Sequence, residues 1–198
     1  MVVEMLKEQY RPCEPIVLSD MKWLKISSGA LRQTFKRMSD KGILKRYMNG
    51  VYYFPDNSRS PSLEDVLYKM YIGNRREVYG YRSGYAFANE LGVTEKTDEC
   101  PIIVTNKENS RGRFRKMVIG QVYLKKPYRS VTEDNANAQA VLDFIREWEV
   151  YSDLSEEDTF TQVKKYMKRN HISKEVLAET AEDFPGRVSM MIVKHRLI

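Results

Sequence analysis

Hydrophobic and polar residues alternate with helical spacing between residues 28 and 41. One face is apolar and consists of Ala30, Leu31, Phe35 and Met38. The opposite face is polar and basic and consists of Arg32, Gln33, Lys36 and Arg37. Ser27 or Ser28 is suited to accept from the unpaired amides of the first turn, and Gly42 stands where a left-handed residue ends a helix. We therefore predict an amphipathic helix over residues 28–41.

A second pattern, alternation with a period of two, follows this helix. Residues 43–48 and 51–54 flank the pair Asn49-Gly50, which is typical of a type I′ turn between two antiparallel strands. A two-residue turn of this type sets Tyr47 opposite Tyr52. The sequence thus predicts a β-hairpin directly after the helix.

The helix and the hairpin together suggest a winged helix. A helix with a basic outer face fits the major groove of DNA, and an adjoining hairpin can press on the flanking backbone. The hairpin carries Lys45 and Arg46 on opposite faces, so at least one of them stays exposed. The residues expected to bind DNA are Ser28, Arg32, Gln33, Lys36, Arg37, Lys45 and Arg46. The alternative is an α+β domain whose polar helix face is simply solvated.

The chain is long enough for two small domains, each with its own core. A helix over residues 2–10 and a short helix over residues 20–24 precede the basic helix, which completes the winged-helix order. The polar segment 56–61 contains no apolar anchor and is expected to be a linker. We predict a winged-helix DNA-binding domain at 1–57 and a second domain at 58–198.

The second domain is expected to be mixed α/β over residues 62–131 and helical over 132–198. Its expected helices are 62–72, 84–91 after a cap at Ser83, 132–148 with Glu133 and Asp134 in its first turn, 155–169, 173–183 and 185–197. Its expected strands are 101–105, 116–119 and 121–125. The fold class is therefore α+β, with an N-terminal winged helix-turn-helix domain followed by a mixed α/β domain whose C-terminal part is helical.

A second basic patch lies in the middle of the chain. It consists of Arg111, Arg113, Arg115 and Lys116, with aromatic Phe114 interleaved. Two interpretations fit it, a surface for nucleic acid and a charged sheet edge that discourages strand aggregation; the second is favoured.

Charge is distributed unevenly along the chain, whose net charge is +6. Residues 1–57 have 10 Lys and Arg against 6 Asp and Glu, residues 58–130 have 14 against 8, and residues 131–198 have 9 against 13. The basic first two parts suit a polyanion, whereas the acidic end is free for another task. No apolar run is long enough to span a membrane or to follow the first Met as a signal peptide, so a cytoplasmic protein is expected.

Residues suited to catalysis or metal binding are few. The two histidines, His171 and His195, lie in the acidic end, and the two cysteines, Cys13 and Cys100, are expected to be buried reduced thiols. We therefore expect no catalytic residue, no metal site and no cofactor. The enzymatic alternative is a magnesium-dependent nuclease using Glu95, Asp98, Glu99 and Lys107. Its metal site would need a carboxylate at position 105, where this chain has Thr105.

Several short motifs resemble those of the AbiE-type abortive-infection antitoxins. They are Leu31-Arg32, Lys41-Gly42, Leu44, Gly50-Val51-Tyr52, Gly80-Tyr81-Arg82-Ser83-Gly84, Leu91-Gly92-Val93-Thr94 and the segment Ile102–Asn106. The resemblance covers about residues 16–131 and includes no catalytic residue.

This resemblance implies a bacterial protein with two tasks. A winged-helix domain would bind double-stranded operator DNA and repress the protein's own operon, and a homodimer on the DNA fits this picture. The C-terminal domain would neutralise a nucleotidyltransferase-like toxin encoded beside it. A plain winged-helix regulator, whose second domain dimerises or senses a ligand, is the remaining alternative.

Overall fold

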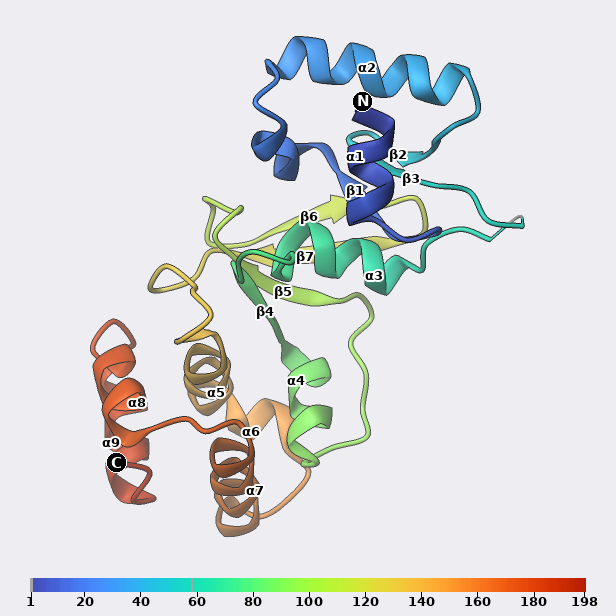
Figure 1. Cartoon of the computed structure of the whole chain (residues 1–198). Coiled ribbons are helices and arrows are strands. Elements are labelled where there is room, and N and C mark those ends of the chain that lie inside the picture. The colour runs from blue at the N-terminus through green and yellow to red at the C-terminus, as the bar shows by residue number, and fades with distance from the viewer. Residues whose placement is uncertain (1, 58) are drawn as a thin grey trace. The chain divides into compact units, whose positions relative to one another are not determined.

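The computed structural model describes residues 2–57 and 59–198, and the chain forms two compact units (Figure 1). The first unit ends at Met70 and the second begins at Tyr71. Each contains helices and one small sheet, so the fold is mixed α/β.

The N-terminal unit contains one small sheet and several short helices. In chain order its elements are α1 (Val2–Gln9), β1 (Ile16–Val17), the 3-10 helix η1 (Leu18–Leu24), α2 (Ser28–Asp40), β2 (Lys45–Met48), β3 (Val51–Tyr53) and α3 (Leu63–Leu67). A π-helical turn, η2 (Tyr68–Ile72), continues α3 across the boundary between the units. The strands are antiparallel in the order β1-β3-β2, so the hairpin predicted from the sequence is extended by β1.

The core of this unit forms where α2 packs beside the sheet. Leu31, Phe35 and Met38 are buried as predicted, and the Phe35 ring meets the Tyr52 ring edge-on at 5.2 Å between centroids. Ala30, however, is exposed. Each helical residue is turned by about 100° from its neighbour, which places Ala30 outside the stripe that begins at Leu31.

The register of the hairpin differs from the prediction at one residue. Met48 lies opposite Val51, but Arg46 rather than Tyr47 lies opposite Tyr52, because a bulge interrupts β2 between positions 46 and 48. Of the turn pair, Gly50 has a positive φ of 80° and Asn49 does not, so the type I′ turn is not formed. The expected pairing of Tyr47 with Tyr52 is therefore wrong, since the bulge adds a residue to one strand.

The boundary between the compact units lies later than residue 57. Helix α3 begins as predicted, with the Ser62 hydroxyl accepting from the Asp65 amide at 3.0 Å. It belongs to the first unit, and the Lys69 ammonium pairs there with the Glu14 carboxylate at 2.9 Å. The compact unit that contains the hairpin therefore also includes α3.

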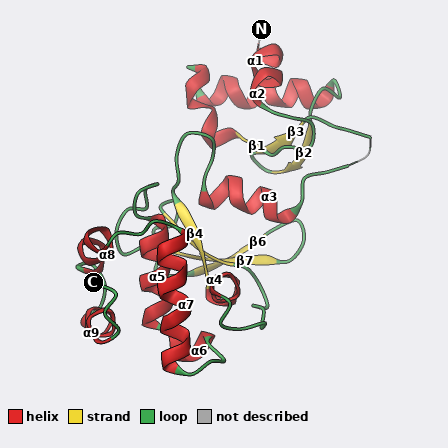
Figure 2. Cartoon of the chain, turned by 60° about the horizontal axis from the view of Figure 1, so that its bottom comes forward, coloured by secondary structure: helices red, strands yellow, loops and turns green. Residues whose placement is uncertain are grey.

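The C-terminal unit combines a four-stranded sheet with helices. Its elements are β4 (Gly80–Ser83), α4 (Gly84–Leu91), β5 (Ile102–Thr105), β6 (Arg113–Lys116), β7 (Gln121–Lys125), α5 (Ala136–Arg146), α6 (Trp148–Tyr151), α7 (Glu156–Arg169), α8 (Lys174–Ala181) and α9 (Gly186–Lys194). The strand order is β4-β5-β7-β6, with β5 and β7 parallel and the other pairs antiparallel. Helix α5 is central and contacts β4, α8 and α9, while α7 closes the same core with Phe160 and Val163 (Figure 2).

Two elements of this unit differ from the expected bounds. The strand expected at 116–119 lies at 113–116, because the chain turns back through Gly120, whose φ is +69° and whose carbonyl accepts from the Met117 amide at 3.0 Å. Helix α5 begins at Ala136, so Glu133 and Asp134 precede its first turn. By contrast, Ser155 caps α7 as expected, accepting from the Asp158 amide at 3.2 Å.

Candidate nucleic-acid interface

The polar face of α2 is presented to solvent by the burial of the opposite face. Ser27 fixes the start of the helix by accepting from the Ala30 amide at 3.3 Å. Gly42, with a φ of +70°, follows its end. The side chains predicted to contact DNA from this helix are all exposed: Ser28, Arg32, Gln33, Lys36 and Arg37.

The cations of this face have no protein partner. Within residues 2–57 and 59–198, neither Arg32 nor Lys36 nor Arg37 forms an ion pair or a side-chain hydrogen bond. Asp40, exposed at the C-terminal end of the same helix, adds a negative charge there. Arg32 lies in the second turn of α2, and Lys36 and Arg37 lie in its C-terminal half, so the positive charge extends along the helix.

The hairpin adds two exposed cations beside this helix in the chain. Lys45 lies opposite Tyr53 and Arg46 opposite Tyr52, and both are exposed. Both remain accessible because β2 is an edge strand, with β3 between it and β1. The prediction that at least one of the two faces solvent is confirmed.

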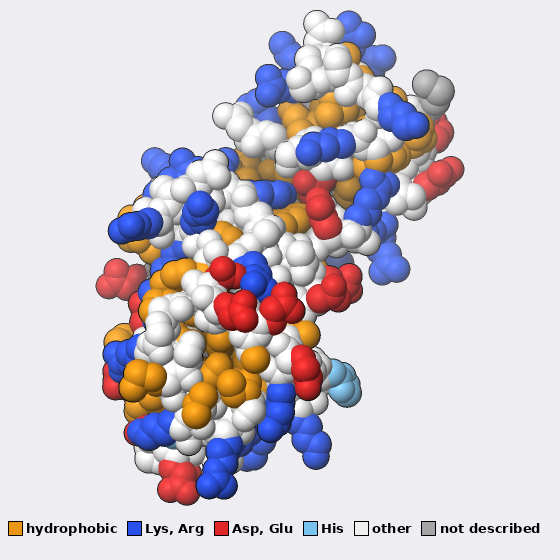
Figure 3. Space-filling model, turned by 90° about the vertical axis from the view of Figure 1, so that its left-hand side faces the viewer, with side chains coloured by type: hydrophobic (Ala, Val, Ile, Leu, Met, Phe, Trp, Pro, Cys, Tyr) orange, Lys and Arg blue, Asp and Glu red, His pale blue; other side chains and the backbone are white. Residues whose placement is uncertain are grey.

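Two further lysines precede α2 and were missed in the sequence pattern. Lys22 and Lys25 are both exposed, and Lys25 adopts a left-handed conformation with φ of 54°. The sequence Lys-Trp-Leu-Lys at residues 22–25, at the end of η1, could have indicated these two basic side chains. Basic side chains are accordingly numerous on the surface of the N-terminal unit (Figure 3).

The second basic patch has a different arrangement. Arg113 pairs with the carboxylate of Glu108 at 2.5 Å, and that carboxylate is only 3% exposed. The Arg115 guanidinium lies 5.6 Å from the centre of the Tyr71 ring, Arg111 lines a cavity, and Lys116 is exposed. Strand β6 carries Arg113, Arg115 and Lys116 and is an edge strand, so the charged-edge interpretation agrees with the topology for these three residues.

Glu108 organises the loop before β6. Its carboxylate accepts from the amides of Asn109 and Ser110 and from the Ser110 hydroxyl, at 2.8–2.9 Å. Burial acts to raise the pKa of Glu108, but these hydrogen bonds and the one from Arg113 outweigh it and lower the pKa to about 2. Arg113 is therefore held in place by a buried anion.

The residues of the nuclease alternative do not converge on a metal site. Asp98 accepts from the Ala86 amide at 3.3 Å at the start of α4. Gly84, with a φ of +66°, allows this approach, since a Cβ there would lie 2.8 Å from the carboxylate. Burial raises the pKa of Asp98, and hydrogen bonds from the backbone amides of Ala86 and Tyr85 oppose the rise. Thr105 is buried and donates to the Tyr79 carbonyl at 3.1 Å, and the Lys107 ammonium lies 3.7 Å from the centre of the Tyr79 ring.

The expected cap at Ser83 is also absent, because Asp98 occupies that role. The Ser83 hydroxyl instead donates to the buried Asp143 carboxylate at 2.6 Å. Among the described residues, no group of three or more His, Cys, Asp and Glu side chains could hold a metal ion.

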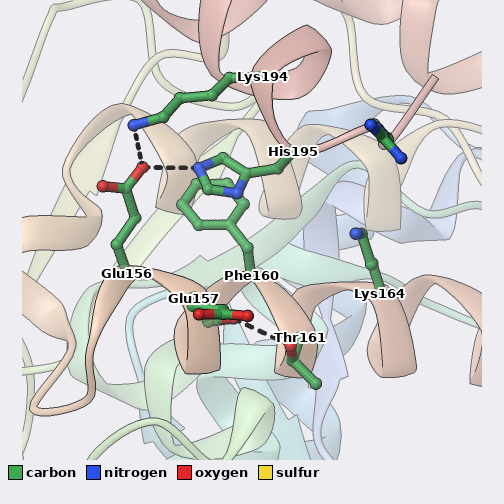
Figure 4. Close-up of a pocket in the computed structure, with 8 residues that line it drawn as sticks. Glu156, Glu157, Phe160, Thr161, Lys164, Lys194 and His195 are labelled. Atoms are coloured by element: carbon green, nitrogen blue, oxygen red, sulfur yellow. Dashed lines mark hydrogen bonds and ion pairs between the residues drawn. The ribbon is translucent and has the colours of Figure 1, made fainter.

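His195 lies in a surface cavity of about 510 Å³ between the start of α7 and the end of α9 (Figure 4). Its Nε2 is 2.7 Å from Glu156, the Lys194 ammonium is 2.5 Å from the same carboxylate oxygen, and its ring stacks on Phe160 at 3.6 Å. The Lys194 and His195 contacts lower the pKa of Glu156. The Thr161 hydroxyl, which also lines this cavity, donates to the Glu157 carbonyl within α7. The contacts of Lys194 and His195 with Glu156 join the end of α9 to α7.

The two cysteines are less buried than the sequence predicts. Cys13 and Cys100 are free and only partly buried, contrary to expectation, because each lies in a connecting segment and not in a core element. Burial nevertheless raises the pKa of Cys100.

Within residues 2–57 and 59–198, every helix is too short or too polar to cross a membrane.

In comparisons with known proteins, no family model matches this chain and no curated protein matches it significantly.

Proposed function

We propose that this chain is a bacterial DNA-binding repressor whose N-terminal unit is a winged helix. A single observation carries the proposal: Arg32, Lys36 and Arg37 on α2, with Lys45 and Arg46 on β2, are exposed and have no partner among the described residues. Phosphates can therefore bind them without breaking any internal contact. The order of α2, the β2–β3 hairpin and the completing strand β1 supports the same interpretation.

In this proposal the two cationic elements have different tasks. The early turns of α2 enter the major groove, where Arg32 and Gln33 reach base edges. Lys45 and Arg46 contact phosphates from the wing. Repression of the protein's own operon and antagonism of a nucleotidyltransferase-like toxin extend the proposal, and the resemblance to the AbiE-type antitoxins supports them. The acidic segment 131–198 is suited to the basic cleft of a partner that handles nucleotides.

The test is selection of bound duplexes from a randomised pool by the full chain. We expect enrichment of one sequence that also occurs upstream of the protein's own gene. The same incubation with magnesium or manganese should leave the DNA uncut. Failure to enrich any sequence would contradict the repressor proposal, and cleavage that Asp98→Ala abolishes would favour the nuclease instead.

The antitoxin role has its own test. The full chain is co-expressed with the product of an adjacent nucleotidyltransferase-like gene, and we expect growth to be restored. Arg32→Ala should restore growth equally, because the role is assigned to the C-terminal unit. Absence of rescue at equal expression would contradict the antitoxin role without affecting DNA binding.

A further inference from the structure

A second cavity, of about 740 Å³, lies entirely within the C-terminal unit. Its walls come from β4, β5, the end of β7 and α5, which supply Tyr81, Val104, Lys125 and Arg146. Sites for small molecules commonly measure about 300–1,000 Å³. The cavity thus has the size for one ligand as large as a mononucleotide.

A hydrogen-bonded acidic cluster forms one wall. The Asp143 carboxylate is 5% exposed and accepts from the Ser83 hydroxyl at 2.6 Å and from Arg146 at 3.0 Å. Arg146 also pairs with Glu147 at 3.0 Å, and the Lys125 ammonium lies 3.9 Å from the same side chain. Both carboxylates of this wall are therefore already compensated, and a cation gains little from binding here.

Two hydrogen-bond donors of the lining are buried without a partner among the described residues. They are the Tyr81 hydroxyl and the Arg146 Nε. Tyr81 is only 6% exposed, and burial, reinforced by the charge of Asp143, raises its pKa well above the ordinary value. The hydroxyl therefore keeps its proton at neutral pH. Unpaired buried donors are rare because each lowers stability. Both atoms expose less than 1 Å², so an acceptor atom on a ligand reaches them only when the lining side chains shift.

The remaining lining provides charge and an aromatic surface. Arg111 and Lys126 are exposed and form no ion pair with a described residue. Tyr128 is 45% exposed, and the Arg146 guanidinium lies 5.7 Å from the centre of its ring. Two uncompensated cations, buried donors and an accessible aromatic ring together favour an anion that has a planar part.

We propose that this cavity binds a small phosphorylated molecule of mononucleotide size. Arg111 and Lys126 hold the phosphate, and Tyr128 lies against the planar part of the ligand. A shift of the lining side chains on binding lets the Tyr81 hydroxyl and the Arg146 Nε donate to an acceptor atom of the ligand. The site does not depend on DNA binding by the N-terminal unit. It assigns a ligand-sensing surface to the C-terminal unit.

The test is isothermal titration of the full chain with pyrophosphate, AMP and uncharged adenosine. We expect AMP and pyrophosphate to bind and adenosine to bind at least about 10-fold more weakly than AMP. Arg111→Gln and Lys126→Gln should each weaken AMP binding about 10-fold. Lys165→Gln, which removes an exposed lysine of α7 outside the cavity, should leave it unchanged. Tyr81→Phe should weaken AMP binding by a similar factor without lowering the melting temperature of the free protein.

Several results would overturn the site. The site is excluded if neither AMP nor pyrophosphate binds with a dissociation constant below about 10 mM. It is also excluded if Lys165→Gln and Lys126→Gln lose affinity for AMP equally. Adenosine binding as tightly as AMP would exclude an anion site, and unchanged affinity in Tyr81→Phe would remove the buried hydroxyl from it. A 5′-phosphorylated tetranucleotide that binds over about 10-fold tighter than AMP would show that the site recognises nucleic-acid ends and not a free small molecule.

Discussion

The two basic surfaces of this protein are similar in sequence and different in structure. On α2 and β2, the cations project from an exposed helix face and an edge strand and have no partner within the described ranges. On β6, Arg113 is paired with buried Glu108 and Arg115 lies over the Tyr71 ring. Charge density alone therefore does not identify a surface for nucleic acid. Among the described residues, Arg32, Lys36, Arg37, Lys45 and Arg46 all lack a protein partner, whereas on β6 Arg113 and Arg115 are engaged and only Lys116 is not.

The physical reason lies in the contacts that a phosphate would have to replace. Moving Arg113 to a phosphate would leave the Glu108 carboxylate buried with one partner fewer, and unpaired buried charges are strongly destabilising. Arg32 and Lys45 exchange only water for phosphate. Three predictions test this contrast.

The largest effect concerns Glu108, whose pKa is lowered from about 4.5 to about 2 in the folded protein. A depressed carboxyl pKa stabilises the fold above pH 4.5, and this contribution is lost as the pH falls toward 2. It amounts to about 3 kcal/mol, since one pKa unit corresponds to about 1.4 kcal/mol. Glu108→Gln should therefore lower the unfolding free energy at neutral pH, and the difference from wild type should shrink in acid.

Urea denaturation across a pH series measures this difference. Glu133→Gln is the matched control, because Glu133 is exposed and lies outside any helix. A difference that stays constant from pH 6 to pH 3 would show that Glu108 does not anchor β6 through its charge.

The next effect concerns base recognition by α2. Arg32→Ala should lower affinity for the selected duplex by about 1–3 kcal/mol and relax the sequence preference at one or two base pairs. Lys7→Ala, which removes an exposed cation from α1, should preserve the preference. Fluorescence anisotropy with the selected and scrambled duplexes distinguishes the two variants. Equal weakening on both duplexes in Arg32→Ala would assign that residue to phosphate contact.

The smallest effect compares one exposed lysine from each basic surface. Lys45→Ala should weaken all duplexes alike and reduce the slope of log affinity against log salt by about one, because one phosphate contact is lost. Lys116→Ala removes an exposed lysine from the other edge strand and should leave both affinity and slope unchanged. Identical salt slopes in the two variants would remove the distinction between the surfaces.

Several parts of this structure were predictable because they depend on residues close together in the chain. The buried stripe of α2 follows from spacing of three and four residues, and the caps at Ser62 and Ser155 act within three residues. The strand at 102–105 follows from its apolar β-branched run. The exposure of Arg32 and Lys36 follows from the same periodicity, so most of the candidate DNA interface was visible in the sequence.

The remaining features were decided by contacts between distant residues. Ser83 reaches Asp143 across 60 positions, and Lys69 reaches Glu14 across 55 within the first unit, which extends to Met70. The cavity beside Tyr81 likewise needs strands and a helix from separate segments. Periodicity reports which face of an element is apolar, but it carries no information on which distant side chain completes a hydrogen bond or an ion pair. Packing selects those partners, and packing therefore determined which cations of this protein remain available.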